Sequence, residues 1–177
     1  MRKLKQGTKR AILWVCLIAT AIGLDQLTKA LAERFLKPVE TVPIWENVLH
    51  LTYVTNKGAA FGMLQNQRWV FLIISTVAIV LLSYYLWVKR CAHPLLCVAL
   101  SLIIGGGIGN MIDRTVLGYV IDFIDFRLIH FAVFNGADSF VTIGCVLAAV
   151  WLLFCYREKE KEKEPVSPAD SGVHSKE

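Results

Sequence analysis

Hydrophobic residues gather in four long runs along the 177-residue chain, at positions 11–24, 69–88, 95–112 and 139–156. A helix needs about 20 mostly apolar residues to cross the hydrocarbon core of a bilayer. The second run meets this length by itself, and the flanks of the other runs complete them. The pattern therefore predicts an α-helical integral membrane protein with four transmembrane helices, at about 11–32, 69–88, 94–113 and 138–156.

The first hydrophobic run allows a second interpretation, a cleaved signal peptide. Five basic residues precede the run, and Ala19-Thr20-Ala21 fits a cleavage site made of small residues. The helical pattern continues past this point, however, as IGLDQLTKALAERFL, in which Asp25 and Lys29 are four residues apart on one face. We therefore expect an uncleaved first span.

Basic residues are distributed unequally between the two sides of the predicted bundle. Residues 1–10, 89–90 and 157–163 hold 11 Lys and Arg on the side of the termini, whereas the two opposite loops hold six. Because cationic loops stay in the cytoplasm, both termini are predicted to be cytoplasmic. The net charge of +5 then reflects membrane orientation, and no nucleic-acid-binding motif accompanies it.

The chain divides into a basic cytoplasmic N-terminus (1–10), one four-span domain (11–156) and a charged cytoplasmic tail (157–177). We expect the tail to be disordered, because it combines alternating charges with two prolines and small polar residues.

The five cysteines lack CxxC spacing, so we interpret them as small apolar residues and predict neither a disulfide framework nor a zinc site. The four histidines are scattered without an HExxH motif, and we predict no metal and no other cofactor.

Two loops on the outer side carry strand patterns. Residues 47–56 (NVLHLTYVTN) alternate between apolar and polar side chains, and residues 119–129 (YVIDFIDFRLI) form a second candidate strand. Residues 58–67 (GAAFGMLQNQ) have the spacing of a short interfacial helix. Since backbone polar groups in lipid must be paired, we expect a small extracytoplasmic β-sheet at the membrane surface.

Five acids lie within or beside the spans on the outer side: Asp25, Asp113, Asp122, Asp125 and Asp138. An ionisable group at membrane depth is a functional candidate. For Asp25, the favoured role is nevertheless a structural ion pair with Lys29 along the same helix. Asp113 could similarly pair with the adjacent Arg114 where a helix ends.

Asp122 is the carboxylate that a structural role explains least. On a strand, Asp125 would share a face with Arg127 and form a salt bridge, whereas Asp122 would lie on an otherwise apolar face. Asp138 could cap the start of a helix, a role for which Asn135 competes. Desolvation and a second carboxylate would both favour the protonated form of Asp122. Asp122 and Asp138 could thus form a pair in which one acid holds a proton while the other takes one from water, as in aspartic proteases.

Five motifs resemble, in order, spacing and placement on the spans, the signatures of the type II signal peptidase family, the bacterial lipoprotein signal peptidases. They are DQLTK (25–29), NKGAAFG (56–62), GGGIGNMIDR (105–114), VIDFIDF (120–126) and FNGADS (134–139). The resemblance covers about residues 10–156. Gly107 and Gly136 depart from the residues that are common in the family, and neither is a catalytic position.

The resemblance implies an inner-membrane aspartic endopeptidase that removes the signal peptide of prolipoproteins by cleaving just before a Cys that carries diacylglycerol. It places the catalytic dyad at Asp122 and Asp138, the pair that the strand pattern also favours. Supporting or substrate-binding positions would be Asp25, Lys29, Asn56, Gly58, Gly106, Asn110, Asp113, Arg114, Asn135 and Ala137. The implied partners are the prolipoprotein and membrane phospholipid, and the implied state is a monomer. The site would lie near the outer leaflet of the bacterial cytoplasmic membrane. As a separate hypothesis, segments 48–56 and 58–67 would clamp the substrate over the two acids.

Two other functions compete with proteolysis. A small proton or ion carrier would use the acids as relay sites, but it favours acids in mid-span and inverted repeats. Here the acids cluster at the ends of the spans, and no repeat is evident. A non-enzymatic assembly subunit would use the glycines for helix packing, but it leaves Asp122 unexplained.

Overall fold

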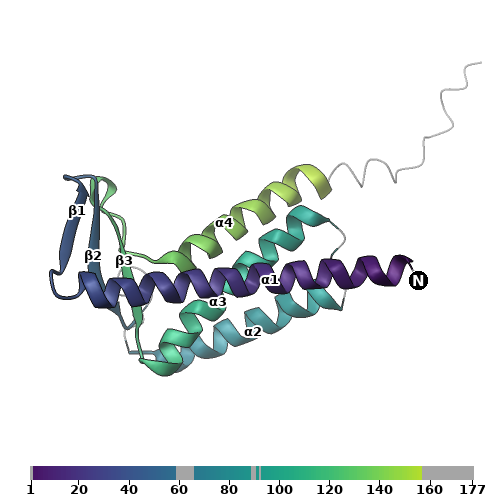
Figure 1. Cartoon of the computed structure of the whole chain (residues 1–177), viewed down its shortest axis with the longest axis horizontal. Coiled ribbons are helices and arrows are strands. Elements are labelled where there is room, and N and C mark those ends of the chain that lie inside the picture. The colour runs from purple at the N-terminus through teal and green to yellow at the C-terminus, as the bar shows by residue number, and fades with distance from the viewer. Residues whose placement is uncertain (1, 59–65, 89–90, 92, 157–177) are drawn as a thin grey trace, which may run out of the picture.

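The computed structural model describes residues 2–58, 66–88, 91 and 93–156. The long helices of this part of the chain are α1 (Arg2–Leu31), α2 (Arg68–Trp87), α3 (Pro94–Val116) and α4 (Gly136–Val150) (Figure 1). Short π-helical segments, Ala32–Leu36 and Trp151–Tyr156, continue α1 and α4. All four helices are long and apolar enough to cross a membrane, which confirms the predicted four-helix architecture.

A three-stranded antiparallel sheet lies at one end of the helices (Figure 1). Its strands are ordered β1 (Thr41–Trp45), β2 (Leu49–Asn56) and β3 (Val120–Phe126). β2 and β3 are the two strands that the sequence predicts. The edge strand β1 escapes the sequence pattern, because it is short, contains Pro43 and has every residue exposed.

The pairing of β2 with β3 brings distant residues together. Asn56 pairs with Val120, and the register shifts between Leu51 and Val54. Beyond β3, Phe134 forms an isolated antiparallel bridge with Ile124. The segment that precedes α4 therefore runs alongside β3.

Helix α3 is central and packs against each of the other three helices. A Cβ atom added at Gly105 would lie 2.8 Å from the Cβ of Ala21, and one at Gly106 would collide with the carbonyl oxygen of Ala137. Small residues allow membrane helices to approach this closely. The glycines thus bring α3 against α1 and α4, as their position in the sequence suggests.

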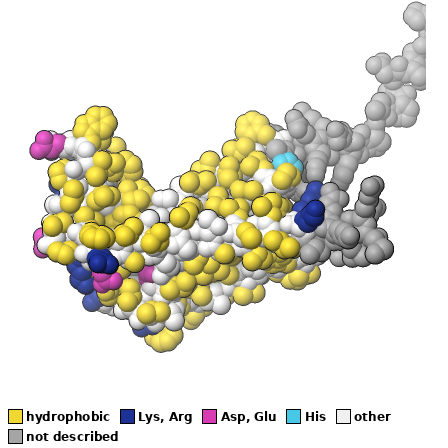
Figure 2. Space-filling model, viewed as in Figure 1, with side chains coloured by type: hydrophobic (Ala, Val, Ile, Leu, Met, Phe, Trp, Pro, Cys, Tyr) yellow, Lys and Arg dark blue, Asp and Glu magenta, His cyan; other side chains and the backbone are white. Residues whose placement is uncertain are grey.

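Buried apolar side chains fix the two parts of the fold. Within the helices, the core cluster comprises Trp14, Leu86, Leu96, Cys97, Leu100 and Ile104. A second cluster of Ala32, Leu36 and Ile121 joins the end of α1 to the sheet. Many other large apolar side chains of the helices are exposed, and the surface in Figure 2 is largely hydrophobic, as expected for contact with lipid.

A disulfide joins Cys91, which lies between α2 and α3, to Cys97 near the start of α3, and this corrects the expectation that the cysteines are simply small apolar residues. The chain turns into the first residues of α3 between these two cysteines, and a separation of six residues matches no motif that would reveal the pair. Cys16 and Cys145 are free. Most of the predicted interfacial helix at 58–67, and all of the tail at 157–177, lie outside the described residues.

Candidate active site

Asp122 lies in β3 with only 2% of its surface exposed, and two asparagine side chains bind its carboxylate. Asn56, the last residue of β2, donates from Nδ2 to Oδ2 over 2.9 Å. Asn135 donates from Nδ2 to Oδ1 over 2.6 Å. The Gly58 N–H in turn donates to Asn56 Oδ1 over 2.9 Å and so fixes the Asn56 amide. The Asp122 carboxylate is therefore held from two sides, by Asn56 and by Asn135.

Asp138 lies in the first turn of α4, where it takes part in a capping box. Asn135 is the N-cap: its Oδ1 accepts the Asp138 N–H over 3.0 Å, and Asp138 Oδ2 accepts the Asn135 N–H over 3.2 Å. The structure thus gives each of the two competing residues a part in the cap. Capping uses one carboxylate oxygen of Asp138, and the other, Oδ1, accepts a 2.7 Å bond from Asn110 Nδ2.

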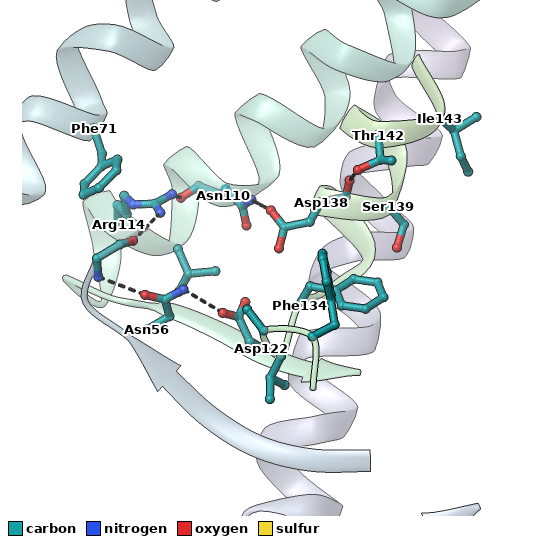
Figure 3. Close-up of a pocket in the computed structure, with 15 residues that line it drawn as sticks. Asn56, Phe71, Asn110, Arg114, Asp122, Phe134, Asp138, Ser139, Thr142 and Ile143 are labelled. Carbon is teal, nitrogen blue, oxygen red and sulfur yellow. Dashed lines mark hydrogen bonds between the residues drawn. The ribbon is translucent and has the colours of Figure 1, made fainter. Parts of the chain in front are cut away.

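Asn110 and Asn135 join the two aspartates into one hydrogen-bonded network. Asn135 Nδ2, besides binding Asp122, donates to Asn110 Oδ1 over 3.1 Å. The network therefore runs from Asp138 through Asn110 and Asn135 to Asp122. Figure 3 shows the two carboxylates projecting toward the same space from β3 and α4.

Lys29 connects this network to two further acids, Asp25 and Asp113. Its ammonium lies 2.8 Å from Asp25 Oδ2 and 2.9 Å from Asp113 Oδ2, and the lysine is 2% exposed. It also donates to Asn110 Oδ1 over 2.9 Å. The predicted pair of Asp25 with Lys29 is confirmed, but it is buried and connects three helices to one another. Among the described residues, the ion pair of Asp113 is with Lys29 and not with the adjacent Arg114, because α1 packs against that face of α3.

Further bonds tie the two buried acids to the backbone and to a residue that the sequence did not single out. Asp25 Oδ1 accepts the N–H of Ala137 at the start of α4 over 2.8 Å. Asp113 Oδ2 accepts the Ile121 N–H over 3.3 Å. Gln26 Nε2 donates to Asp113 Oδ1 over 2.9 Å. The only sequence signal for Gln26 is its place in the DQLTK motif.

A cavity of about 600 Å³ opens beside the two carboxylates. Arg114 lies at its wall, where Nη2 donates to the Gly58 carbonyl over 3.2 Å and the guanidinium packs over the Phe71 ring at 4.8 Å. The polar lining comprises Asn56, Asn110, Arg114, Asp122, Asp138, Ser139 and Thr142. The other lining residues are a glycine and seven residues with apolar side chains: Gly58, Phe71, Val120, Phe131, Ala132, Val133, Phe134 and Ile143.

Burial raises the pKa of the Asp122 carboxyl from 3.8 to about 6. The negative charge of Asp138 raises this pKa further. The hydrogen bonds from Asn56 and Asn135 and the positive charge of Lys29 lower it, without cancelling the effect of burial. Asp122 therefore holds its proton to a higher pH than an ordinary aspartate, up to about pH 6.

The structure brings eleven of the twelve predicted site residues into this network or its cavity, Ala137 through its backbone N–H. The twelfth, Gly106, meets Ala137 at the crossing of α3 and α4. No pattern in the sequence indicates that residues 131–133 form part of the cavity wall, as they do in the structure. Asp125 stays outside: it accepts a bond from Thr52 and forms the predicted salt bridge with Arg127, at 3.0 Å. No group of three His, Cys, Asp or Glu side chains within the described ranges could hold a metal ion.

Comparisons with known proteins match the part of the chain that carries this site. Residues 17–154 match the family model described as signal peptidase (SPase) II. The lipoprotein signal peptidase of Clostridioides difficile (strain 630) is 47% identical over 143 residues, which cover 81% of this chain and 96% of that protein. The lipoprotein signal peptidase of Caldanaerobacter subterraneus subsp. tengcongensis is 44% identical, covering 79% and 95%. A solved bacterial membrane enzyme has a similar fold, with a TM-score of 0.75 and 30% identity over 88% of this chain and 94% of its own.

Proposed function

The chain belongs to the signal peptidase II family, and from this premise we propose that it is an endopeptidase whose catalytic pair is Asp122 and Asp138. One observation carries the proposal: two buried carboxylates, from β3 and α4, converge on one cavity. Asn110 and Asn135 connect these carboxylates by short hydrogen bonds. Two acids in such a site share one proton, which is the arrangement that acid–base hydrolysis requires.

The reaction uses water as the nucleophile. The ionised aspartate takes a proton from a water molecule whose oxygen attacks the scissile carbonyl carbon, and the protonated aspartate gives its proton to the carbonyl oxygen. A tetrahedral intermediate forms. It collapses when the aspartate that took the water proton gives it to the amide nitrogen and the C–N bond breaks. A hydroxyl proton of the intermediate returns to the other aspartate, which leaves a new carboxyl group, a free amine and the pair with one proton as before. The raised pKa of Asp122, about 6, supports a pair that keeps one proton at a higher pH than ordinary aspartates do.

We propose that the substrate is a prolipoprotein whose Cys carries diacylglycerol, and that cleavage occurs just before this Cys. The cavity suits such a substrate, since it combines the two acids with an apolar wall that includes Phe131 and Phe134. It lies where the helices meet the sheet, so acyl chains could stay in lipid while the peptide bond reaches the acids. With both termini cytoplasmic, as the basic residues indicate, this end faces the outer leaflet.

Cleavage of a diacylglyceryl prolipoprotein by purified variants tests the proposal. Asp122→Asn and Asp138→Asn should each lower kcat by at least about 10²-fold, because neither amide can transfer the required proton. Asp125→Asn is the matched control, since Asp125 lies on the same strand but binds Thr52 and Arg127 instead of facing the cavity. It should keep wild-type activity. Full activity of either dyad variant would overturn the assignment, and inhibition by a chelator would redirect it to a metal enzyme.

A further inference from the structure

The ammonium of Lys29 is buried, and each of its three N–H groups has an acceptor. Two are the carboxylates of Asp25 and Asp113, at 2.8 and 2.9 Å, and the third is Asn110 Oδ1, at 2.9 Å. An ammonium group donates hydrogen bonds and accepts none. The side-chain atom of Asn110 that faces Lys29 must therefore be its oxygen.

Two donors face the Asn110 oxygen, Lys29 Nζ at 2.9 Å and Asn135 Nδ2 at 3.1 Å, and the bond from the ammonium is the charge-assisted one. With Oδ1 turned toward Lys29, Nδ2 faces Asp138 Oδ1, to which it donates over 2.7 Å. The reversed amide would set an NH2 group against the ammonium and a carbonyl oxygen against the carboxylate. Both contacts would be repulsive, and both of the bonds that they replace are charge-assisted, which makes them roughly twice as strong as neutral ones.

The second asparagine is oriented without the lysine. Asn135 Oδ1 accepts the backbone N–H of Asp138 over 3.0 Å, and a backbone N–H can only donate. This bond turns Asn135 Nδ2 toward Asp122, where the distance is 2.6 Å. The third amide, that of Asn56, is oriented by the Gly58 N–H. Of the three amides that bind the two acids, Asn110 is the one that Lys29 contacts.

We propose that Lys29 is a positioning residue that acts through Asn110: by fixing the amide of Asn110, it holds the carboxylate of Asp138 in the orientation that the reaction requires. Asp25 and Asp113 place the ammonium, and the ammonium makes the stronger of the two bonds that favour this orientation of the Asn110 amide, the other being the bond from Asn135. This role rests on the proposed function of Asp122 and Asp138. It goes beyond an ion pair that joins α1 to α3, because an ion pair alone would have no effect on the orientation of Asp138.

A double-mutant cycle on kcat tests the proposal with purified protein. Lys29→Met should lower kcat at least about tenfold and leave KM within about twofold, since the change affects the acids more than the binding of the substrate. In an Asn110→Ala background, where no amide remains to be oriented, Lys29→Met should lower kcat by less than about threefold. Losses that multiply in the double variant, or a raised KM with unchanged kcat, would overturn the positioning role.

Two further variants separate positioning from folding. Lys37→Met is the matched control, because Lys37 forms the same i,i+4 pair with Glu33, at 3.1 Å, but on the exposed surface. It should keep wild-type kcat. Lys29→Met/Asp113→Asn keeps the net charge of the wild type, so it should regain thermal stability but keep a low kcat. Recovery of kcat together with Tm, or failure of both Lys29 variants to fold, would assign Lys29 to the fold alone. Full activity of Asp122→Asn would instead remove the proposed function itself.

Discussion

Replacing Asn56 by alanine should raise the pKa of Asp122 and move the alkaline limb of the pH–activity profile upward. Asn56 Nδ2 is one of two side-chain donors to this carboxylate, at 2.9 Å from Oδ2. The bond stabilises the ionised form and so lowers a pKa that burial raises to about 6. Without the donor, the protonated form persists to higher pH. Since the acid pair requires one proton, kcat/KM should decline at a higher pH than in the wild type.

The size of the shift follows from the strength of the lost bond. Hydrogen bonds to charged groups contribute about 1.5–3 kcal/mol, and a change of one pKa unit corresponds to about 1.4 kcal/mol. Complete loss of the bond would therefore raise the pKa by about one to two units. Water that enters the space left by the side chain will replace part of the bond, so we expect an upward shift of about one unit.

The same variant should make stability depend more strongly on pH. The pKa of Asp122 is higher in the folded state than the ordinary value of 3.8, so the folded state binds the proton more tightly. This contribution to stability is complete below about pH 4 and is lost as the pH rises through about 6. Asn56→Ala enlarges the loss at high pH only. The Tm difference between variant and wild type should thus be larger at about pH 8 than at about pH 5.

The assay is kcat/KM for a diacylglyceryl prolipoprotein between about pH 5 and pH 9, with Tm measured at both ends. Thr52→Val is the control, because Thr52 lies on the same strand but donates to Asp125, over 2.8 Å. An alkaline limb that stays in place or moves downward in Asn56→Ala would refute the reasoning. An equal movement in Thr52→Val would do the same.

Three further changes test the packing around the site. Gly106→Val should lower Tm and abolish activity, because even a Cβ at this position would collide with the carbonyl oxygen of Ala137 in α4. Gly107→Ala is the matched control and should be tolerated, because its Cβ would lie 3.4 Å from the nearest side-chain atom. Reduction of Cys91–Cys97 should leave kcat unchanged in the same cleavage assay, since the disulfide lies at the opposite end of α3 from the acids. Arg127→Met breaks a half-exposed salt bridge and should cost less than about 1 kcal/mol in a denaturation experiment, with normal cleavage.

The parts of the fold that depend on local pattern could be predicted from the sequence. Apolar runs of sufficient length mark the four helices, and alternation marks β2 and β3. The anomaly of Asp122 on an apolar strand also indicates a buried carboxylate, which the structure contains. β1 could not be predicted, because a short exposed edge strand has no apolar face to reveal it. The Cys91–Cys97 pair depends on the geometry of a turn and not on a motif.

The role of each polar residue at the site could not be predicted, because it depends on which helix faces which. Helical spacing places Asp25 and Lys29 on one face, and this alone supports a simple ion pair. The spacing does not reveal that this face packs on α3, where Lys29 reaches Asp113 and Asn110. Gln26 illustrates the same limit, since its bond to Asp113 exists only because α1 and α3 are in contact.

The glycines of α3 connect the packing of the helices to the chemistry of the acids. A Cβ at Gly109 would lie 2.5 Å from Asp25 Oδ2, so the glycine leaves room for a carboxylate that holds both Lys29 and the start of α4. A buried lysine is tolerated only when its charge is paired and each N–H has a partner. The close approach of α1 to α3 supplies those partners, and one of them is the amide of Asn110. If the proposed roles hold, the contacts that allow a charge to be buried between the helices are also contacts that orient the proposed catalytic pair, so a change in one should affect the other.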